Sequence, residues 1–366
     1  MAGKEKTMNV TLNSLPTKTW NQLKMNETTL TVEGDFANHT PQAQWDAAEV
    51  RWLPQAPWAD GPAAYGFSTD LSELTAGADA ALVETAAGQA MTAPIVLRYT
   101  YEAQEHGVSR LVLHAAPDSL LSAVLVFQSP KEGSADVSAL QIQIDAEDRA
   151  QVRLYVAQLL GQDSLSLHEV SGVCGEDAHV QVVRLDLGSQ QAYVGTNLDL
   201  KGRSSRFTTN IGYHTRPEQV LDMNYVALHH GPRTESLMEV SGTLEQNGRK
   251  VFRGTIDFQQ GCPGAKGTES ENVLLMGDNM VNQTIPLILC KEEDVEGNHG
   301  ASIGELDDKV LFYLGARGIA PEAARKMIAH SRIEAVCNRI PSEEVRRLVR
   351  EFEEVEEASN DEDLQS

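Results

Sequence analysis

The chain has 366 residues, with 53 acidic against 30 basic residues and a formal net charge of −23. This balance argues against a nucleic-acid partner and against an anionic membrane surface, because both require clustered Lys and Arg. The sequence contains no apolar leader stretch and no run of about 18 apolar residues, so we expect a cytoplasmic protein. Its four cysteines form no CxxC pair, which argues against a disulfide framework and a self-contained zinc site.

Residues 1–94 form the first expected region. Short apolar pieces alternate there with turn formers such as Leu15-Pro16 and Gly61-Pro62. We predict a mixed, irregular N-terminal region, and the sequence does not indicate what it does.

Strand-like alternation begins at about Pro94 and continues for nearly two hundred residues. The run Leu140-Gln-Ile-Gln-Ile144 is typical, and turn formers such as Asn247-Gly248 separate the runs. Strand centres recur at roughly 12 to 16 residues, which suits a solenoid whose coils stack their strands. We predict a mainly β fold with a parallel β-helix core over 95–303. A large sandwich or split barrel is the alternative.

A helical pattern follows Gly300. Asp307 and Asp308 suit a helix start, Arg317-Gly318 suits its end, and Pro321 suits the first turn of the next helix. We predict a C-terminal α-helical subdomain over 304–357. The last sixteen residues contain eight acids and no Lys or Arg, which predicts an acidic disordered tail over 358–366.

Motif searches leave two classes of function open. No GxxxxGK[ST] sequence occurs, so the chain does not hydrolyse ATP through a P-loop. A β-helix with paired carboxylates would also suit a carbohydrate-active lyase or hydrolase. Acids are abundant here, however, so a chance pair is common, and aromatic residues make up only 5% of the chain.

The most specific stretch starts at Gly254 and reads GTIDFQQGCPGAKGTESENVLLMGDNMVNQTIPLILCKEEDVEGNHGASIGELDDKVLFYLGARGI. Its Gly-Ala turn, its Leu-Leu and Gly-Asp segment, its Ile-Pro strand, its His-Gly turn and its FYLxxRG segment follow one another as in the SufB/SufD family of iron–sulfur cluster assembly scaffolds. The resemblance is firm from about His229 to Gly318. It implies a right-handed parallel β-helix flanked by helices, in a protein without catalytic residues.

The resemblance also implies partners. In this family the C-terminal helical segment docks a SufC-type ATPase, and the end of the β-helix pairs with a SufB-type paralogue; a cysteine desulfurase system is a further expected partner. The docking residues expected here are Phe312, Tyr313, Leu314 and Arg317. We expect no cluster to be bound stably by the chain alone, and a transient iron–sulfur cluster at the subunit interface.

One histidine is the expected metal ligand. The family position corresponds to His299, in a turn, where the imidazole would be a transient iron or cluster ligand. The alternative is a turn histidine that hydrogen-bonds a backbone carbonyl and caps the last coil.

Two positions indicate the SufD-like branch. SufB-type chains carry a cysteine where this chain has Met280, and a glutamate where it has Gly300. Many SufD proteins also carry a cysteine at the position of Gly297, so a Cys-plus-His pair is in doubt here. The nearest thiol is Cys290, at the end of an apolar strand, where we expect it to be buried.

Overall fold

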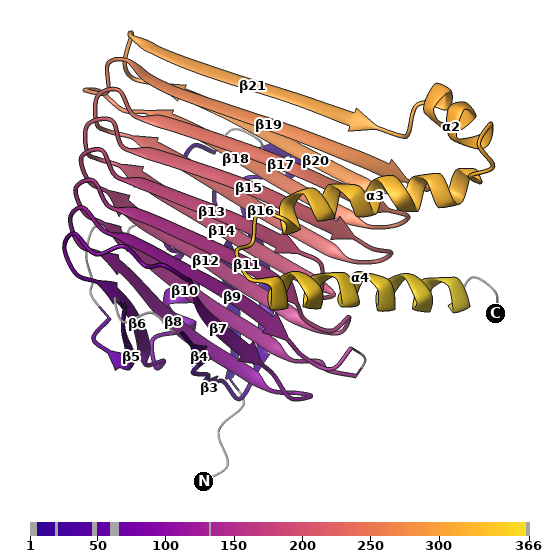
Figure 1. Ribbon diagram of the computed structural model, residues 1–366, viewed down its shortest axis with the longest axis horizontal. Helices are drawn as coiled ribbons and strands as arrows, with labels where there is room; N and C mark the ends of the chain where they lie inside the picture. Colours follow the sequence, from indigo (N-terminus) through magenta and orange to yellow (C-terminus); the bar gives the residue numbers. More distant parts are fainter. Residues whose placement is uncertain (1–5, 19–20, 46–49, 59–65, 132, 364–366) are drawn as a thin grey trace.

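The computed structural model describes residues 6–18, 21–45, 50–58, 66–131 and 133–363. These residues are mainly β, and their strands wind into a parallel β-solenoid of about eight turns that is followed by helices (Figure 1). The β-helix predicted from the strand spacing is therefore confirmed. Its parallel pairing excludes the sandwich and split-barrel alternatives.

Successive strands alternate between two sheets, because each coil contributes one strand to each. The first sheet contains β6 (Ala80–Thr85), β8 (His106–Ala115), β10 (Val137–Ala146), β12 (Leu165–Cys174), β14 (Gln191–Leu200), β16 (Val220–His229), β18 (Arg249–Phe258) and β20 (Val281–Cys290). The second sheet contains β7 (Ile95–Thr100), β9 (Leu120–Gln128), β11 (Gln151–Leu159), β13 (His179–Asp186), β15 (Arg206–Thr215), β17 (Glu235–Glu245), β19 (Ala265–Met276) and β21 (Val295–Gly304).

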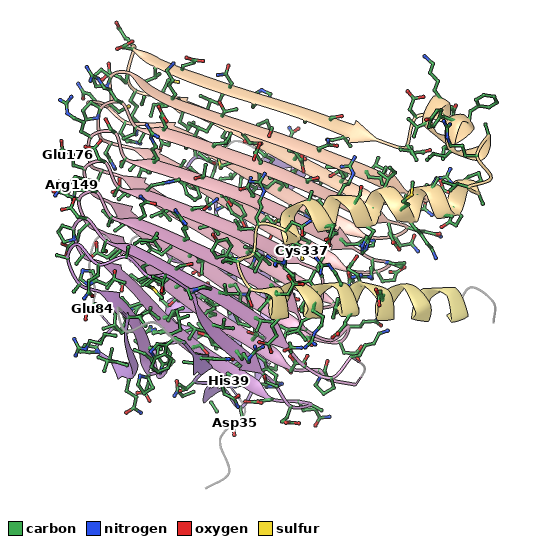
Figure 2. The ribbon with its side chains drawn as sticks, in the orientation of Figure 1. Asp35, His39, Glu84, Arg149, Glu176 and Cys337 are labelled. Atoms are coloured by element: carbon green, nitrogen blue, oxygen red, sulfur yellow. The ribbon has the colours of Figure 1, made fainter. Side chains whose placement is uncertain are left out.

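A column of left-handed residues runs along one edge of the solenoid. Five successive turns contain one residue with φ between 54° and 59°: Asp118, Arg149, Asp177, Ser204 and Arg233. The amide of each donates to a carbonyl oxygen in the next coil, as in the 2.7 Å bond from Arg149 to Glu176 (Figure 2). These bonds satisfy the turn backbone and hold neighbouring coils in register.

The hydrophobic core lies between the two sheets. Large fully buried side chains fill it, including Tyr99, Phe127, Phe207, Tyr213, Tyr225, Phe252 and Phe258. Burial of each such side chain contributes about 1.5 to 3 kcal/mol to folding. Because every coil adds a layer to this core, the interior is continuous along the solenoid up to its last strands.

N-terminal elements cover the outer face of the first sheet. The antiparallel strands β1 (Lys6–Leu12) and β2 (Thr28–Gly34) lie there with helix α1 (Thr69–Leu74). Their apolar residues pack on the outward residues of the sheet in a cluster that includes Val10, Leu12, Leu71, Val108 and Leu167. A 3₁₀ helix, Asn21–Leu23, lies between the two strands in sequence.

The solenoid reaches back into the region expected over 1–94. Strand β6 pairs in parallel with β8, so the boundary expected at residue 95 comes one strand too late. Strands β3 (Ala37–Asn38), β4 (Gln42–Gln44) and β5 (Val50–Ala56) pair with β8, β7 and β6 respectively. Strands β3 and β4 are too short to show local alternation in the sequence, and the partners of all three strands are distant along the chain.

Helices cover the outer face of the second sheet. After α2 (Asp308–Gly315), α3 (Pro321–Cys337) and α4 (Glu343–Asp363) lie across this face (Figure 1). Ile333, Val336, Val345 and Val349 pack against the outward residues of β9, β11 and β13. The backbone of α4 remains helical to Asp363, beyond the tail boundary expected at residue 358. Within the described chain, no helix is long and apolar enough to span a bilayer.

Candidate functional site

The last coil of the solenoid has an open end. Strands β20 and β21 are the terminal strands of the two sheets, and each pairs with a described strand on one side only. Val281 on β20 and Ile303 on β21 are exposed apolar residues at this end. An uncovered strand edge with apolar side chains is typical of a surface that pairs with another protein.

His299 lies in the middle of β21 and is exposed. Its position in a strand corrects the expectation of a turn histidine that caps the last coil. In the parallel register His299 is the partner of Glu269 on β19. Paired residues on parallel strands project to the same face, and Glu269 projects into the solenoid. The imidazole of His299 therefore extends from the inner face of the last strand, where no further coil of the described chain covers it.

A charged network fills the interior beneath this end. The ammonium of Lys250 donates to Glu271 Oε1 and, over 2.9 Å, to Thr284 Oγ1. Thr284 Oγ1 in turn donates to Glu271 Oε2 over 2.7 Å. Lys250 and Glu271 have fully buried side chains, and burial lowers the pKa of Lys250 although Glu271 partly offsets this effect. Removing either partner would leave a buried charge unpaired, which would strongly destabilise the fold.

Glu269 lies beside this network and is only 3% exposed. Burial and the nearby charge of Glu271 raise its pKa to about 7, although Lys250 lowers it in part. Its carboxylate crosses the interior toward Gly254 on β18, where an added Cβ would lie 2.1 Å from Glu269 Oε2. The glycine therefore leaves the space that this carboxylate occupies.

An imidazole and a carboxylate on adjacent strands are both ligand types suited to iron. The sequence did not single out Glu269, Glu271 or Lys250. One sequence feature could have indicated them. Glu269 and Glu271 lie an even number of residues from the apolar Ala265 and Val273 on β19, so their side chains project to the same inner face. Which inward polar residue lies beneath His299 follows only from the register.

Other positions of the resemblance cluster at the same end. Met280 lies partly buried directly before β20, and Gly300 on β21 has no atom within 4 Å of an added Cβ. A Cβ at Gly297 would lie 2.8 Å from Ile288 Cγ2, so a side chain at that position would point into the last coil. Neither Gly297 nor Gly300 offers a ligand.

Cys290 is exposed, which corrects the expectation that this thiol is buried. It ends β20, and because β20 is the terminal strand of its sheet, no further coil within the described residues covers the thiol. The other three cysteines, Cys174, Cys262 and Cys337, are buried. The open end therefore presents one thiol and one imidazole on different sheets.

The expected docking residues lie on or just after α2, which has no buried residue. Phe312 is 80% exposed and Tyr313 is 55% exposed, while Leu314 is partly buried. The guanidinium of Arg317 lies 3.7 Å from the centre of the Tyr313 ring, a cation–π contact. Phe312 and Tyr313 are thus not part of the hydrophobic core.

The family called "SUF system FeS cluster assembly, SufBD core domain" matches residues 99–332, which is more than half of the chain. The chain belongs to the SufBD family. Membership confirms the resemblance seen around residues 254–318 and extends it along most of the solenoid. Membership supports a role in SUF iron–sulfur cluster assembly.

Curated relatives carry both SufB and SufD names. The SufD protein of Bacillus subtilis is 27% identical over 132 residues, which cover 36% of this chain and 30% of that protein. The SufB protein of the same organism is 27% identical over 181 residues, covering 49% and 39%. A SufBD family protein of Staphylococcus saprophyticus is 24% identical over 225 residues, covering 61% and 48%. Each alignment spans less than half of the relative's own length.

Proposed function

We propose that this SufBD family member is a non-catalytic, SufD-like scaffold subunit of a cytoplasmic SUF assembly complex. It pairs with a SufB-type paralogue through the open end of its solenoid and docks a SufC-type ATPase through α2. The observation that supports this proposal best is the open end itself. Two terminal strands leave apolar residues, His299 and Cys290 uncovered there.

The ligands missing from this chain support the SufD-like assignment. Met280 has a thioether and Gly300 has no side chain, whereas a SufB-type chain has thiolate and carboxylate at these positions. A thioether binds ferrous or ferric iron weakly compared with a thiolate. The partner therefore supplies the principal sulfur and iron ligands, and His299 adds one imidazole from this side of the seam.

The iron–sulfur cluster is cargo in this proposal. It forms transiently where the two subunits meet, with sulfur delivered by a cysteine desulfurase system, and the isolated chain does not retain it. Family membership favours this role over the carbohydrate-active alternative.

The test is co-expression of the chain with a SufB-type paralogue and a SufC-type ATPase, followed by anaerobic purification. Iron and acid-labile sulfide are then measured for each complex. We expect His299→Ala to leave complex assembly intact, because the side chain is exposed, and to lower both contents at least fivefold.

His230→Ala is the matched control, since it removes another exposed imidazole, which lies directly after β16. Its iron and sulfide contents should equal those of the wild type. Equal contents in the His299→Ala complex would remove His299 from the mechanism. Failure of the wild-type chain to capture the paralogue would contradict the pairing.

A further inference from the structure

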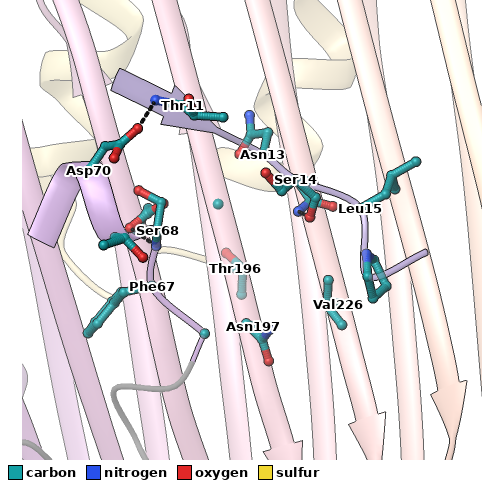
Figure 3. Close-up of a pocket in the computed structure, with 16 residues that line it drawn as sticks. Thr11, Asn13, Ser14, Leu15, Phe67, Ser68, Asp70, Thr196, Asn197 and Val226 are labelled. Carbon is teal, nitrogen blue, oxygen red and sulfur yellow. Dashed lines mark hydrogen bonds between the residues drawn. The ribbon is translucent and has the colours of Figure 1, made fainter. Parts of the chain in front are cut away.

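A cavity of about 500 Å³ lies between the N-terminal elements and the outer face of the first sheet. Figure 3 shows its two walls, one formed by the segment with Thr11, Asn13 and Ser14, the other by Phe67, Ser68 and Asp70. Strands β12, β14 and β16 form the floor. This site is on the side wall of the solenoid, and neither the open end nor α2 contributes to it.

The floor contains a glycine in the middle of a row of polar side chains. Glu169 on β12, Gly195 on β14 and Asn224 on β16 are register partners across the three strands. Their side chains would normally form a continuous ladder along the sheet. The glycine interrupts the ladder and opens the cavity between a carboxylate and a carboxamide.

Asn13 lies over the gap and is fixed in orientation. Its Nδ2 donates to Asp222 Oδ1 over 2.7 Å and to the Asp222 carbonyl oxygen over 3.0 Å. Asp222 is itself held by the buried guanidinium of Arg253. Since Nδ2 faces Asp222, Oδ1 of Asn13 faces the floor, 3.5 Å from an added Cβ at Gly195.

Among the described residues, no donor reaches the side-chain carbonyl oxygen of Asn224. The residue is 8% exposed, and its Nδ2 donates to the Ser14 carbonyl oxygen over 3.3 Å, whereas Oδ1 accepts no hydrogen bond within the part of the chain that the structure describes. Exchanging the two atoms of the amide would place two oxygens against each other, so Oδ1 is the free atom. A buried acceptor without a donor costs about 1 to 3 kcal/mol, which a ligand that donates a hydrogen bond would recover.

Glu169 places a carboxyl group at the other side of the gap. Its carboxylate accepts from the Ser68 amide over 3.0 Å and from Gln141 Nε2 over 3.2 Å. Burial raises its pKa to about 7, which these hydrogen bonds lower only in part. Asp70 is a second carboxylate in the lining, whereas no Lys or Arg is among the described lining residues.

We propose that this cavity binds a small organic amine through its protonated nitrogen. The ammonium lies over Gly195 and donates to Glu169 Oε1 and Asn13 Oδ1, which would lie 3.8 and 3.5 Å from an added Cβ there. Asn224, the register partner of Gly195 on β16, offers a third acceptor. Apolar parts of the ligand lie against Phe67, Leu15 and Val226, which also line the cavity. Acceptors without cationic side chains select against phosphates and carboxylates, which need donors.

Isothermal titration calorimetry with the full chain tests this proposal. The probes are spermidine and ethanolamine as amines, inorganic phosphate as an anion and myo-inositol as an uncharged polyol. We expect at least one amine to bind at least tenfold more tightly than phosphate and myo-inositol. Equal affinity for all four probes would overturn the proposal.

Variants separate the cavity from general attraction to an acidic protein. Gly195→Val fills the floor and should abolish binding, and Glu169→Gln should weaken it at least tenfold. Glu305→Gln removes one exposed charge after β21 and should change nothing. Circular dichroism checks that each variant is folded. If Gly195→Val is unfolded, Asn224→Leu replaces it, with the same expected loss. Binding that is unchanged in the folded cavity variants would refute the site.

Discussion

Gly242 shows at the residue scale how one absent side chain determines the packing of the solenoid. It is the register partner of the fully buried Tyr213, and an added Cβ would lie 2.4 Å from the tyrosine ring. Gly242→Ala should therefore lower the free energy of unfolding by about 2 kcal/mol, because overpacking forces buried groups to move. Urea unfolding followed by circular dichroism measures this change.

Gly77→Ala is the control, because an added Cβ there has no atom within 4 Å. It should change the free energy of unfolding by less than about 0.5 kcal/mol. In a Tyr213→Ala background, Gly242→Ala should lose most of its effect, since the ring is gone. An equal cost in both backgrounds would show that the ring is not the cause.

The sequence predicted which residues occupy the candidate site better than it predicted their exposure and their neighbours. The positions of His299, Met280 and Gly300 follow from the order of the motifs. Cys290 is exposed because β20 is the terminal strand of its sheet, which follows from the strand order and not from the apolar pattern around the cysteine. Glu269 lies beside His299 only through the register of β19 and β21, which local alternation does not specify.

At the scale of elements, α4 is anchored to the second sheet by a buried charge network. Glu353 pairs with Arg216 and lies 3.2 Å from His214 Nδ1, while His214 Nε2 lies 2.7 Å from Glu245. Burial raises the pKa of Glu353, but Arg216 and His214 outweigh it and hold that pKa well below its usual range. Burial and Arg216 lower the pKa of His214, but Glu353 and Glu245 outweigh them and raise it to about 9.

Glu353→Gln should lower the free energy of unfolding by about 3 kcal/mol at pH 6, because it leaves buried cations without their anion. The raised pKa of His214 adds stability that is complete below its unfolded pKa of about 6.5 and is lost as the pH rises through 9. The difference between wild type and variant should therefore narrow from pH 6.5 to 9.5. Urea unfolding across this range measures it.

Glu354→Gln is the neighbouring control, because Glu354 is exposed. It should cost less than about 0.5 kcal/mol at every pH in the series. A constant difference between Glu353→Gln and wild type from pH 6.5 to 9.5 would mean that His214 does not share its proton with this network.

Elements differed in how well the sequence predicted them. Long strands such as β10 and β11 contain regular apolar alternation, and α3 begins at Pro321, so these elements were predictable. Strands β3 and β4 have only two and three residues, so no local period marks them. Strand β5 has seven residues, but it contains a proline and its burial does not alternate. The turn column was also missed, because arginine and serine at positive φ carry no composition signal.

On the scale of the whole molecule, the two outer faces of the solenoid are covered and one end is open. N-terminal elements cover the first sheet, and α3 and α4 cover the second. Helix α2 follows β21 directly and projects near the open end (Figure 1). Paralogue pairing and ATPase docking, as proposed, would therefore use neighbouring but separate surfaces. A conformational change in the ATPase would then act close to the interface between the two scaffold subunits.

A variant with both Phe312→Ala and Tyr313→Ala tests the docking part. Both side chains are exposed, so thermal unfolding should be unchanged, whereas capture of a SufC-type ATPase should weaken at least tenfold, about 1.4 kcal/mol. Loss of the Tyr313 ring also frees Arg317 from its stacked position. Leu23→Ala removes an exposed apolar side chain from the N-terminal region and should not affect capture. Equal ATPase retention by the α2 variant and the Leu23→Ala control would show that α2 is not the docking surface.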